Sequence, residues 1–311
     1  MEELFGDLKK GQKTCQRTVP CQCQYFAPQK IEEALEILSK YGKEIKVIAG
    51  GTDLLIQYYD RLYEVGSWLD LKNIKELKEI KIYQNQIEVG AMVSHAQLEK
   101  SEDIKKYFPI LNQAAADIGS PQIRNRGTIG GNIVNASPAG DLLAPLMAYD
   151  AQFRLLSTQG EKIVPAEEFF IDPKKTILRP EQLLVQIILP LPKKKTYGCW
   201  IKIGKRKALI IATITLALVV EMAEDNNTIK DVRTCLGSVA PTPIEIKEIR
   251  KKMVEKNFNQ LDFAELGQIV EDKISPIDDI RGTREYRKDI AKNIMINALK
   301  EIISQLEGDY R

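Results

Sequence analysis

The sequence predicts a globular chain of mixed helices and strands, folded as two or three packed units. Its 311 residues are too many for one comfortable hydrophobic core. Segments with helical spacing of apolar residues alternate with short β-branched runs, and 44% hydrophobic with 28% charged residues is typical of globular proteins. A single small domain and a fibrous or disordered chain are therefore excluded.

Charge and hydropathy exclude two classes of partner. Lys and Arg number 45 against 43 Asp and Glu, with both signs interspersed, so no basic stripe predicts binding to nucleic acid. The longest apolar run, Leu209 to Val220, is well short of the roughly 20 residues that cross a bilayer. The acidic N-terminus lacks the pattern of a signal peptide. We expect a cytoplasmic protein with no membrane span.

An N-terminal arm, residues 1–24, contains three of the five cysteines, namely Cys15, Cys21 and Cys23. An odd number of cysteines spread over a long chain does not indicate a disulfide framework. The spacing of these three matches no standard metal motif, and a full site would need a fourth ligand. We expect free thiols and predict no metal site, with zinc, an iron–sulfur cluster or an element that faces a partner as the alternatives.

The elements that follow the arm alternate between helix and strand. Residues 31–41 present one apolar helical face and end at Gly42, and residues 44–51 form a short strand that stops at two glycines. Short strands are predicted between Trp68 and Met92, and a helix is predicted to begin near Pro109. The stretch 120–141, rich in Gly, Asn, Ser and Pro, is too long and too patterned for an idle connector.

The second half begins with a buried helix that runs into a strand over residues 142–157. Another strand, 181–192, is closed by prolines, and the lysine run that follows is a plausible domain boundary. A pair of strands is predicted at 199–204 and 209–223. In the last helix, 288–306, apolar residues recur every four positions, so it is expected to dock on its own domain rather than on a membrane.

Two glycine segments, 49–53 and 128–132, carry the strongest functional signal. Glycine permits positive φ and lets successive backbone N–H groups converge on an anion. Thr52, Thr128 and Asn132 add side-chain donors, so both segments together are expected to clamp a pyrophosphate. Each segment taken alone is most often just a turn.

The sequence contains no other motif that is typical of catalysis or nucleotide binding. The chain has no G-x-G-x-x-G and no G-x-S-x-G, and Gln12 occupies the lysine position of the only stretch that approaches a P-loop. The single histidine, His95, is expected to cap or pack at a helix start and has no catalytic part. The hard chemistry must therefore come from a cofactor or a partner, if the chain takes part in any.

Several strings resemble the FAD-binding subunit of the molybdenum hydroxylases, the xanthine dehydrogenase family. They are AGGTDLL at 49–55, IRNRGTIGGNIVNASPAGDLLAPLMAYDA at 123–151, FFIDPKKTILRPEQLLVQIILP at 169–190, and the segments near 201–212 and 279–287. The second string is the most specific. The resemblance covers about residue 25 to the C-terminus, so the cysteine-bearing arm lies outside it.

The resemblance implies an α+β fold in which a two-part FAD-binding domain of the vanillyl-alcohol-oxidase/PCMH type precedes a C-terminal α+β domain of the CO dehydrogenase flavoprotein type. The expected boundaries are 25–192, with parts of about 25–65 and 66–192, and 193–311.

The resemblance also implies contacts to FAD. Residues of the two glycine segments would hold the pyrophosphate, Asp141 would hold a hydroxyl of the nucleotide, Ile118 would lie beside the cofactor, Leu184 would cover the adenine side and Lys202 would reach the flavin. The first segment is taken as Val47, Ile48, Ala49, Gly50, Gly51, Thr52, Asp53 and Leu54, and the second as Thr128, Ile129, Gly130, Gly131 and Asn132. The bland alternatives are that Asp141 caps the next helix and that Lys202 is a surface lysine.

By the same resemblance, the chain is an oxidoreductase subunit that passes electrons from 2Fe-2S clusters on a small partner, through FAD, to NAD, ferredoxin or another acceptor. A molybdopterin-binding large subunit would oxidise the substrate. In several relatives the stretch that corresponds to residues 207–212 has an acid one or two residues before its final Ile-Ala. Here the residues before Ile211 and Ala212 are apolar, so the acceptor stays open. The alternatives are a non-catalytic assembly subunit with an idle flavin site and a self-sufficient flavin oxidoreductase.

Overall fold

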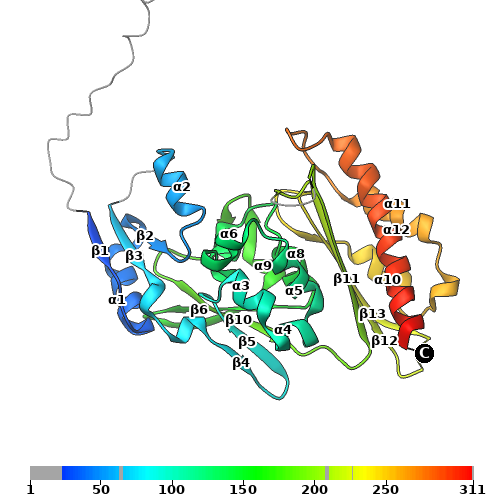
Figure 1. Cartoon of the computed structure of the whole chain (residues 1–311), viewed down its shortest axis with the longest axis horizontal. Helices are drawn as coiled ribbons and strands as arrows, with labels where there is room; N and C mark the ends of the chain where they lie inside the picture. The colour runs from blue at the N-terminus through cyan, green and yellow to red at the C-terminus, as the bar shows by residue number, and fades with distance from the viewer. Residues whose placement is uncertain (1–22, 63–65, 207–209, 226, 310–311) are drawn as a thin grey trace, which may run out of the picture.

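The computed structural model describes residues 23–62, 66–206, 210–225 and 227–309. These residues form three units that follow one another from left to right in Figure 1, each with its own hydrophobic core. The middle unit lies between the N-terminal and the C-terminal unit, so it contacts both.

The N-terminal unit is a small parallel sheet with one helix on its face. Its strands are ordered β1-β3-β2, and α1 buries Ala34, Leu35 and Leu38 against them. The helix α2 follows β2 and stands above the sheet in Figure 1, with most of its apolar side chains exposed. The bounds are β1 (Gln24–Phe26), α1 (Ile31–Tyr41), β2 (Ile45–Ile48), α2 (Leu54–Tyr59) and β3 (Ser67–Asp70).

The middle unit is built on an antiparallel sheet ordered β4-β5-β10-β6-β7. The chain forms six helices between β5 and β6 and returns through a short hairpin before β10. The bounds are β4 (Ile80–Ile82), β5 (Gln86–Gly90), α3 (His95–Lys100), α4 (Glu102–Tyr107), α5 (Pro109–Ala116), α6 (Pro121–Arg126), α7 (Ile129–Asn135), α8 (Leu143–Ala148), β6 (Gln152–Ser157), β7 (Gly160–Pro165), α9 (Ala166–Phe169), β8 (Phe170–Asp172), β9 (Lys175–Thr176) and β10 (Leu183–Pro190).

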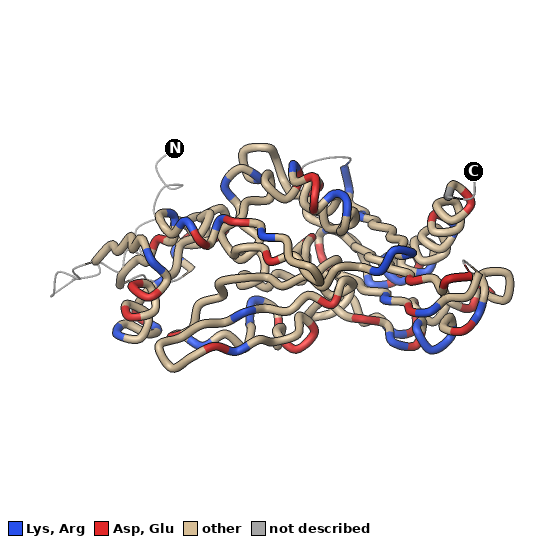
Figure 2. Tube along the Cα trace, turned by 90° about the horizontal axis from the view of Figure 1, so that it is seen from below, with Lys and Arg blue, Asp and Glu red and all other residues tan. Residues whose placement is uncertain are grey.

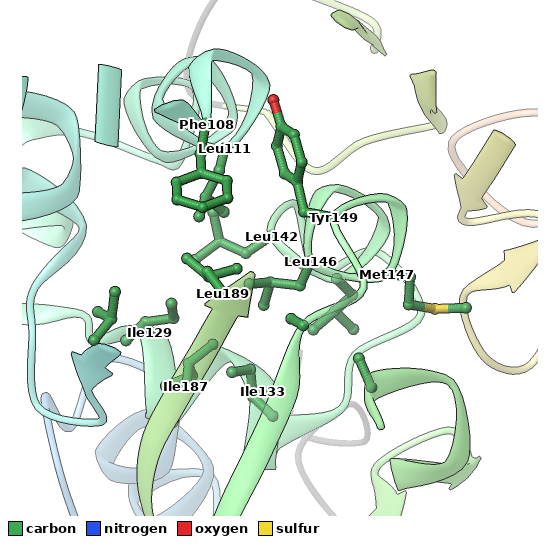
Figure 3. Packing of buried hydrophobic residues seen from close by; sticks show 14 of the residues in the cluster. Phe108, Leu111, Ile129, Ile133, Leu142, Leu146, Met147, Tyr149, Ile187 and Leu189 are labelled. Carbon is green, nitrogen blue, oxygen red and sulfur yellow. The ribbon is translucent and has the colours of Figure 1, made fainter. Parts of the chain in front are cut away.

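The core of the middle unit joins its helices to the central strand. Figure 3 shows Phe108 and Leu111 facing Leu142 and Leu146 above Ile187 and Leu189 of β10. The rings of Phe108 and Tyr149 meet edge to face at 5.0 Å between centroids. This packing fixes α7 and α8, and therefore the segments at their ends, on one rigid body.

The C-terminal unit is a four-stranded antiparallel sheet, ordered β11-β12-β13-β14, covered on one face by helices. Ile294, Ala298 and Ile302 of the long helix α12 are buried in this core. The bounds are β11 (Thr196–Ile203), β12 (Ile214–Met222), β13 (Ile229–Gly237), β14 (Ile244–Glu245), α10 (Lys247–Met253), α11 (Phe263–Lys273) and α12 (Arg284–Asp309).

Most of the expected elements are confirmed, and the exceptions are short helices. The helix ending at Gly42, the pairing of β11 with β12 and the docked last helix all match. The sequence interpretation missed α4, and it treated 120–141 as loops where the structure has α6 and α7. Short helices capped by Ser101, Ser120 and Thr128 carry too few residues for a clear period. The predicted domain boundaries stay predictions.

The described part of the chain has no helix that combines the length and the apolar character needed to cross a membrane. Lys and Arg alternate with Asp and Glu along the trace in Figure 2, which agrees with the absence of a basic stripe in the sequence.

Candidate functional site

The first glycine segment is an open turn between β2 and α2. Gly51 has φ +76°, a conformation that side chains rarely adopt. A Cβ added to Gly50 would lie 2.0 Å from the carbonyl oxygen of Arg126, so only glycine fits there. In the described chain the amides of Gly50, Gly51, Thr52 and Asp53 donate no hydrogen bond. They are available to an anion.

The second glycine segment is the start of a helix rather than a turn. Thr128 caps α7, and its Oγ1 accepts from the amide of Gly131 at 3.0 Å. Gly130 donates to the carbonyl of Ala91 at 2.9 Å, and the amides of Ile129 and Asn132 donate to Val93 and Thr128. Neither Gly130 nor Gly131 has positive φ. The expectation that both segments offer converging N–H groups was therefore wrong for the second one.

Contacts hold the two segments together, although nearly eighty positions separate them in the sequence. Gly50 approaches the backbone of Arg126 and Gly127, and an added Cβ on Gly131 would lie 3.9 Å from Cβ of Ala49. Nδ2 of Asn135, at the end of α7, donates to Oδ1 of Asp53 at 3.2 Å. The two segments are thus one wall of a common cavity.

This cavity has a volume of about 900 Å³ and lies between the N-terminal and the middle unit. One part of it is apolar and includes Leu38, Ile45, Leu71 and Met92. The hairpin of β8 and β9 adds cationic side chains, and the sequence analysis did not single these out. They are Lys174, Lys175 and, just after the hairpin, Arg179.

Most of the predicted site residues line this cavity. They are Val47, Ala49, Gly50, Gly51, Thr52, Asp53, Leu54, Ile118, Thr128, Gly130, Gly131, Asn132 and Leu184. Four predicted residues are not in its wall, namely Ile48, Ile129, Asp141 and Lys202. Ile129 belongs to the core of the middle unit instead.

Asp141 and Lys202 form a buried ion pair where the middle unit meets the C-terminal sheet. Nζ of Lys202 lies 2.7 Å from Oδ2 of Asp141 and also donates to the carbonyl of Asp117 at 2.9 Å. Trp200 donates to the side chain of Asp117. Burial raises the pKa of Asp141 to about 6, against the opposing charge of Lys202. Asp141 does not cap α8, whose N-cap is Leu142.

Two of the three cysteines of the arm, Cys15 and Cys21, lie outside the described residues. Cys23 is exposed and free. Within the described ranges, no group of three His, Cys, Asp or Glu side chains is arranged to hold a metal ion. The candidate cluster at Cys15, Cys21 and Cys23 stays a hypothesis.

Comparison with known families gives this cavity its context. The model described as the FAD binding domain in molybdopterin dehydrogenase matches residues 21–192, more than half of the chain. The chain belongs to this family. A second model, described as the CO dehydrogenase flavoprotein C-terminal domain, matches residues 200–302. The FAD-binding family and the predicted C-terminal fold are confirmed.

Relatives match this FAD-binding subunit over nearly its whole length. The carbon monoxide dehydrogenase medium chain of Hydrogenophaga pseudoflava is 31% identical over 281 residues, covering 90% of this chain and 97% of that one. The nicotinate dehydrogenase FAD-subunit of Eubacterium barkeri is 29% identical over 290 residues, covering 92% and 97%. A solved structure of carbon monoxide dehydrogenase from H. pseudoflava is 30% identical, with a TM-score of 0.86 over 92% of this chain and 99% of that one.

FAD is the cofactor of this oxidoreductase subunit, and the residues of the cavity fit it. The volume lies at the upper end of the roughly 300–1,000 Å³ that is usual for ligand cavities, which suits a large ligand such as a dinucleotide. The donor set suits a pyrophosphate, since the amides of residues 50–53 have no partner among the described residues and lie beside cationic side chains.

Proposed function

We propose that FAD occupies the cavity between the two glycine segments, with its pyrophosphate against the amides of Gly50, Gly51, Thr52 and Asp53. The observation that carries this proposal is that these four N–H groups donate to no described residue and line the cavity. Amides left without a partner are costly unless water or a ligand accepts from them. The second segment supports the first by close packing.

The charges of the cavity support an anionic ligand. Its wall contains Lys43, Lys46, Lys174, Lys175 and Arg179, and among the described residues of the wall the one acid is Asp53, which accepts from Asn135. A cavity lined mainly by one sign of charge concentrates ligands of the opposite sign. The two negative charges of a pyrophosphate are therefore favoured.

The proposal keeps the other contacts that the resemblance implies. Leu184 covers the adenine side, and Ile118 lies beside the cofactor. Lys202 and Asp141 lie near the flavin end of the cofactor. Their position supports this, because Lys202 donates to the carbonyl of Asp117, the residue next to Ile118. Lys202 near the flavin would raise its reduction potential.

As a working role, the chain transfers electrons from 2Fe-2S clusters on a small partner subunit, through FAD, to NAD or ferredoxin, while a molybdopterin-binding large subunit oxidises the substrate. The support is the naming of the relatives as a medium chain and an FAD-subunit. Bound flavin exchanges electrons singly and in pairs, which suits a link between one-electron clusters and a two-electron acceptor. The chain itself holds and shields the flavin.

The test starts from the visible absorption of the purified chain, followed by anaerobic titration with NADH. A flavin band that NADH bleaches supports NAD as the acceptor. A band that reduced ferredoxin bleaches, and NADH does not, supports ferredoxin, whereas a band that only dithionite bleaches points to another acceptor. A colourless chain that takes up no added FAD would contradict the proposal and favour a non-catalytic assembly subunit.

A second experiment tests the partners. The tagged chain is purified from its native cells, and the co-purifying polypeptides are analysed for molybdenum and for acid-labile sulfide. Both should be present in stoichiometric amounts. A chain that purifies alone and oxidises a small substrate with FAD would overturn the assembly and favour a self-sufficient flavin oxidoreductase.

A further inference from the structure

His95 lies at the wall of the cavity, locked against the second glycine segment. It is the only histidine of the chain and the first residue of α3. Its amide donates to the carbonyl of Gly127 at 3.0 Å, and Ser94 forms a β-bridge with Thr128. The side chain lines the cavity although the residue is only 4% exposed. Its place is therefore fixed by backbone contacts on both sides.

The two edges of the imidazole ring have different surroundings. A Cβ added to Gly127 would lie 2.8 Å from Cδ2 and 3.0 Å from Nε2, so this edge packs on Gly127, next to the cavity wall. Nδ1, on the opposite edge, is buried and has no hydrogen-bond partner in the part of the chain that the structure describes. Nε2 has no hydrogen bond to a described residue either but, unlike Nδ1, it is not fully buried, so this cavity-lining residue reaches the cavity through its Nε2 edge.

The ring is neutral at physiological pH. Burial, and then the positive charge of Arg124, lower the pKa of His95 to about 4. Arg124 is held in place by Glu99 and by the carbonyls of Ile118 and Gly119. A neutral imidazole carries one proton. A buried N–H without a partner is rarer than a buried acceptor without one, so the proton belongs on Nε2.

We propose that His95 is a cofactor-binding residue whose Nε2–H donates a hydrogen bond to an acceptor oxygen of the bound FAD. This inference rests on the proposed position of FAD in the cavity. It replaces the expectation that His95 only packs at a helix start. Its role is to orient the cofactor from a position next to the first segment, because Gly127 contacts both Gly50 and the ring of His95.

A single histidine makes the proposal directly observable. The full chain is labelled with ¹⁵N-histidine, and the ring nitrogens are recorded by NMR with FAD bound and after FAD is removed. The expected spectrum shows a neutral ring protonated on Nε2 between about pH 6 and pH 9. Removal of FAD should shift Nε2 and its proton more than Nδ1. A proton on Nδ1, or ring-nitrogen signals that do not change when FAD is removed, would overturn the proposal.

Three substitutions test the same hydrogen bond by affinity. His95→Gln places an amide N–H near the position of Nε2, whereas His95→Asn reaches only the position of Nδ1 and His95→Leu has no donor. The dissociation constant for FAD should rise roughly tenfold to a hundredfold for the Asn and Leu variants and stay close to that of the original chain for Gln. Equal affinity in all three, or equal loss, would refute the role of Nε2. Thermal unfolding of the FAD-free forms checks that each variant is folded.

One further variant separates this inference from the proposed function. Gly50→Ala forces the two segments apart through the contact with Arg126. If Gly50→Ala folds and still binds FAD, FAD is not in this cavity and the proposed site fails. If Gly50→Ala loses FAD while His95→Leu keeps it, the site stands and only the role of His95 fails.

Discussion

The two glycine segments of the cavity look alike in the sequence and differ in physical role. In Ala49–Asp53 the glycines free a turn whose amides have no partner among the described residues. In Thr128–Asn132 every amide from Ile129 onward is satisfied, and Gly130 is required because an added Cβ would lie 2.6 Å from the carbonyl oxygen of Ala91. A Gly-Gly pair thus signals either an exposed anion cradle or a close backbone contact, and the hydrogen bonds decide which.

The largest effect is expected where the two segments touch. Gly50→Ala puts a methyl group on the backbone of Arg126, which cannot move as a side chain would. We expect the free energy of unfolding to fall by about 3 kcal/mol and the FAD content of the purified chain to be lost.

Chemical denaturation and flavin absorbance measure the two quantities. Gly308→Ala is the matched control, because an added Cβ there has nothing within 4 Å. If the two substitutions behave alike, the contact between the segments does not matter.

Acid should lower the free energy of unfolding through His95, which packs next to the second segment. The pKa of His95 falls from 6.5 to about 4 on folding, so the unfolded chain takes up the proton first as the pH drops. This contribution to stability is complete above about pH 6.5 and is lost toward pH 4. It should decline by roughly 2 kcal/mol between pH 6.5 and pH 5.

The measurement is the difference in unfolding free energy between the original chain and His95→Gln across that range, both without FAD. The difference cancels the titration of other groups. A difference that is constant with pH would show that His95 does not keep its low pKa.

A smaller effect tests the turn of the first segment. Gly51 has φ +76°, and Gly51→Ala should cost about 1–2 kcal/mol from backbone strain, since the nearest atom is the flexible side chain of Leu55. FAD binding should weaken because the amides are no longer aimed at the cavity. Gly51→Asn should recover part of both, because asparagine tolerates this conformation. Isothermal titration with FAD measures the affinity, and thermal unfolding measures the stability. If Gly51→Asn is as unstable and binds FAD as weakly as Gly51→Ala, backbone strain is not the cause.

The smallest effect belongs to the helix cap of the second segment. Thr128→Ala removes the acceptor for the amide of Gly131 and should lower stability by about 1 kcal/mol, whereas Thr128→Ser should restore it. If the second segment only packs against the first, Thr128→Ala should lower the affinity for FAD less than Gly51→Ala does. A greater loss of FAD affinity than of stability would assign direct binding to the second segment as well.

The sequence by itself determined the elements with a clear period and the residues on short continuous strings. The helix 31–41, the paired strands after Thr196 and the docked face of α12 followed from spacing alone, because local periodicity records which side is buried. The strings around Gly50 and Gly130 pointed to the family, and most of the site residues predicted from the sequence lie in the cavity wall.

Only the tertiary structure decided what each of these residues does. That Gly50 meets Arg126, that Lys202 pairs with Asp141 and that His95 faces the cavity all depend on segments far apart in the chain. The same holds for the cationic side chains of the hairpin near Lys174. Burial and hydrogen-bond partners are properties of the packed fold, and a local pattern does not contain them.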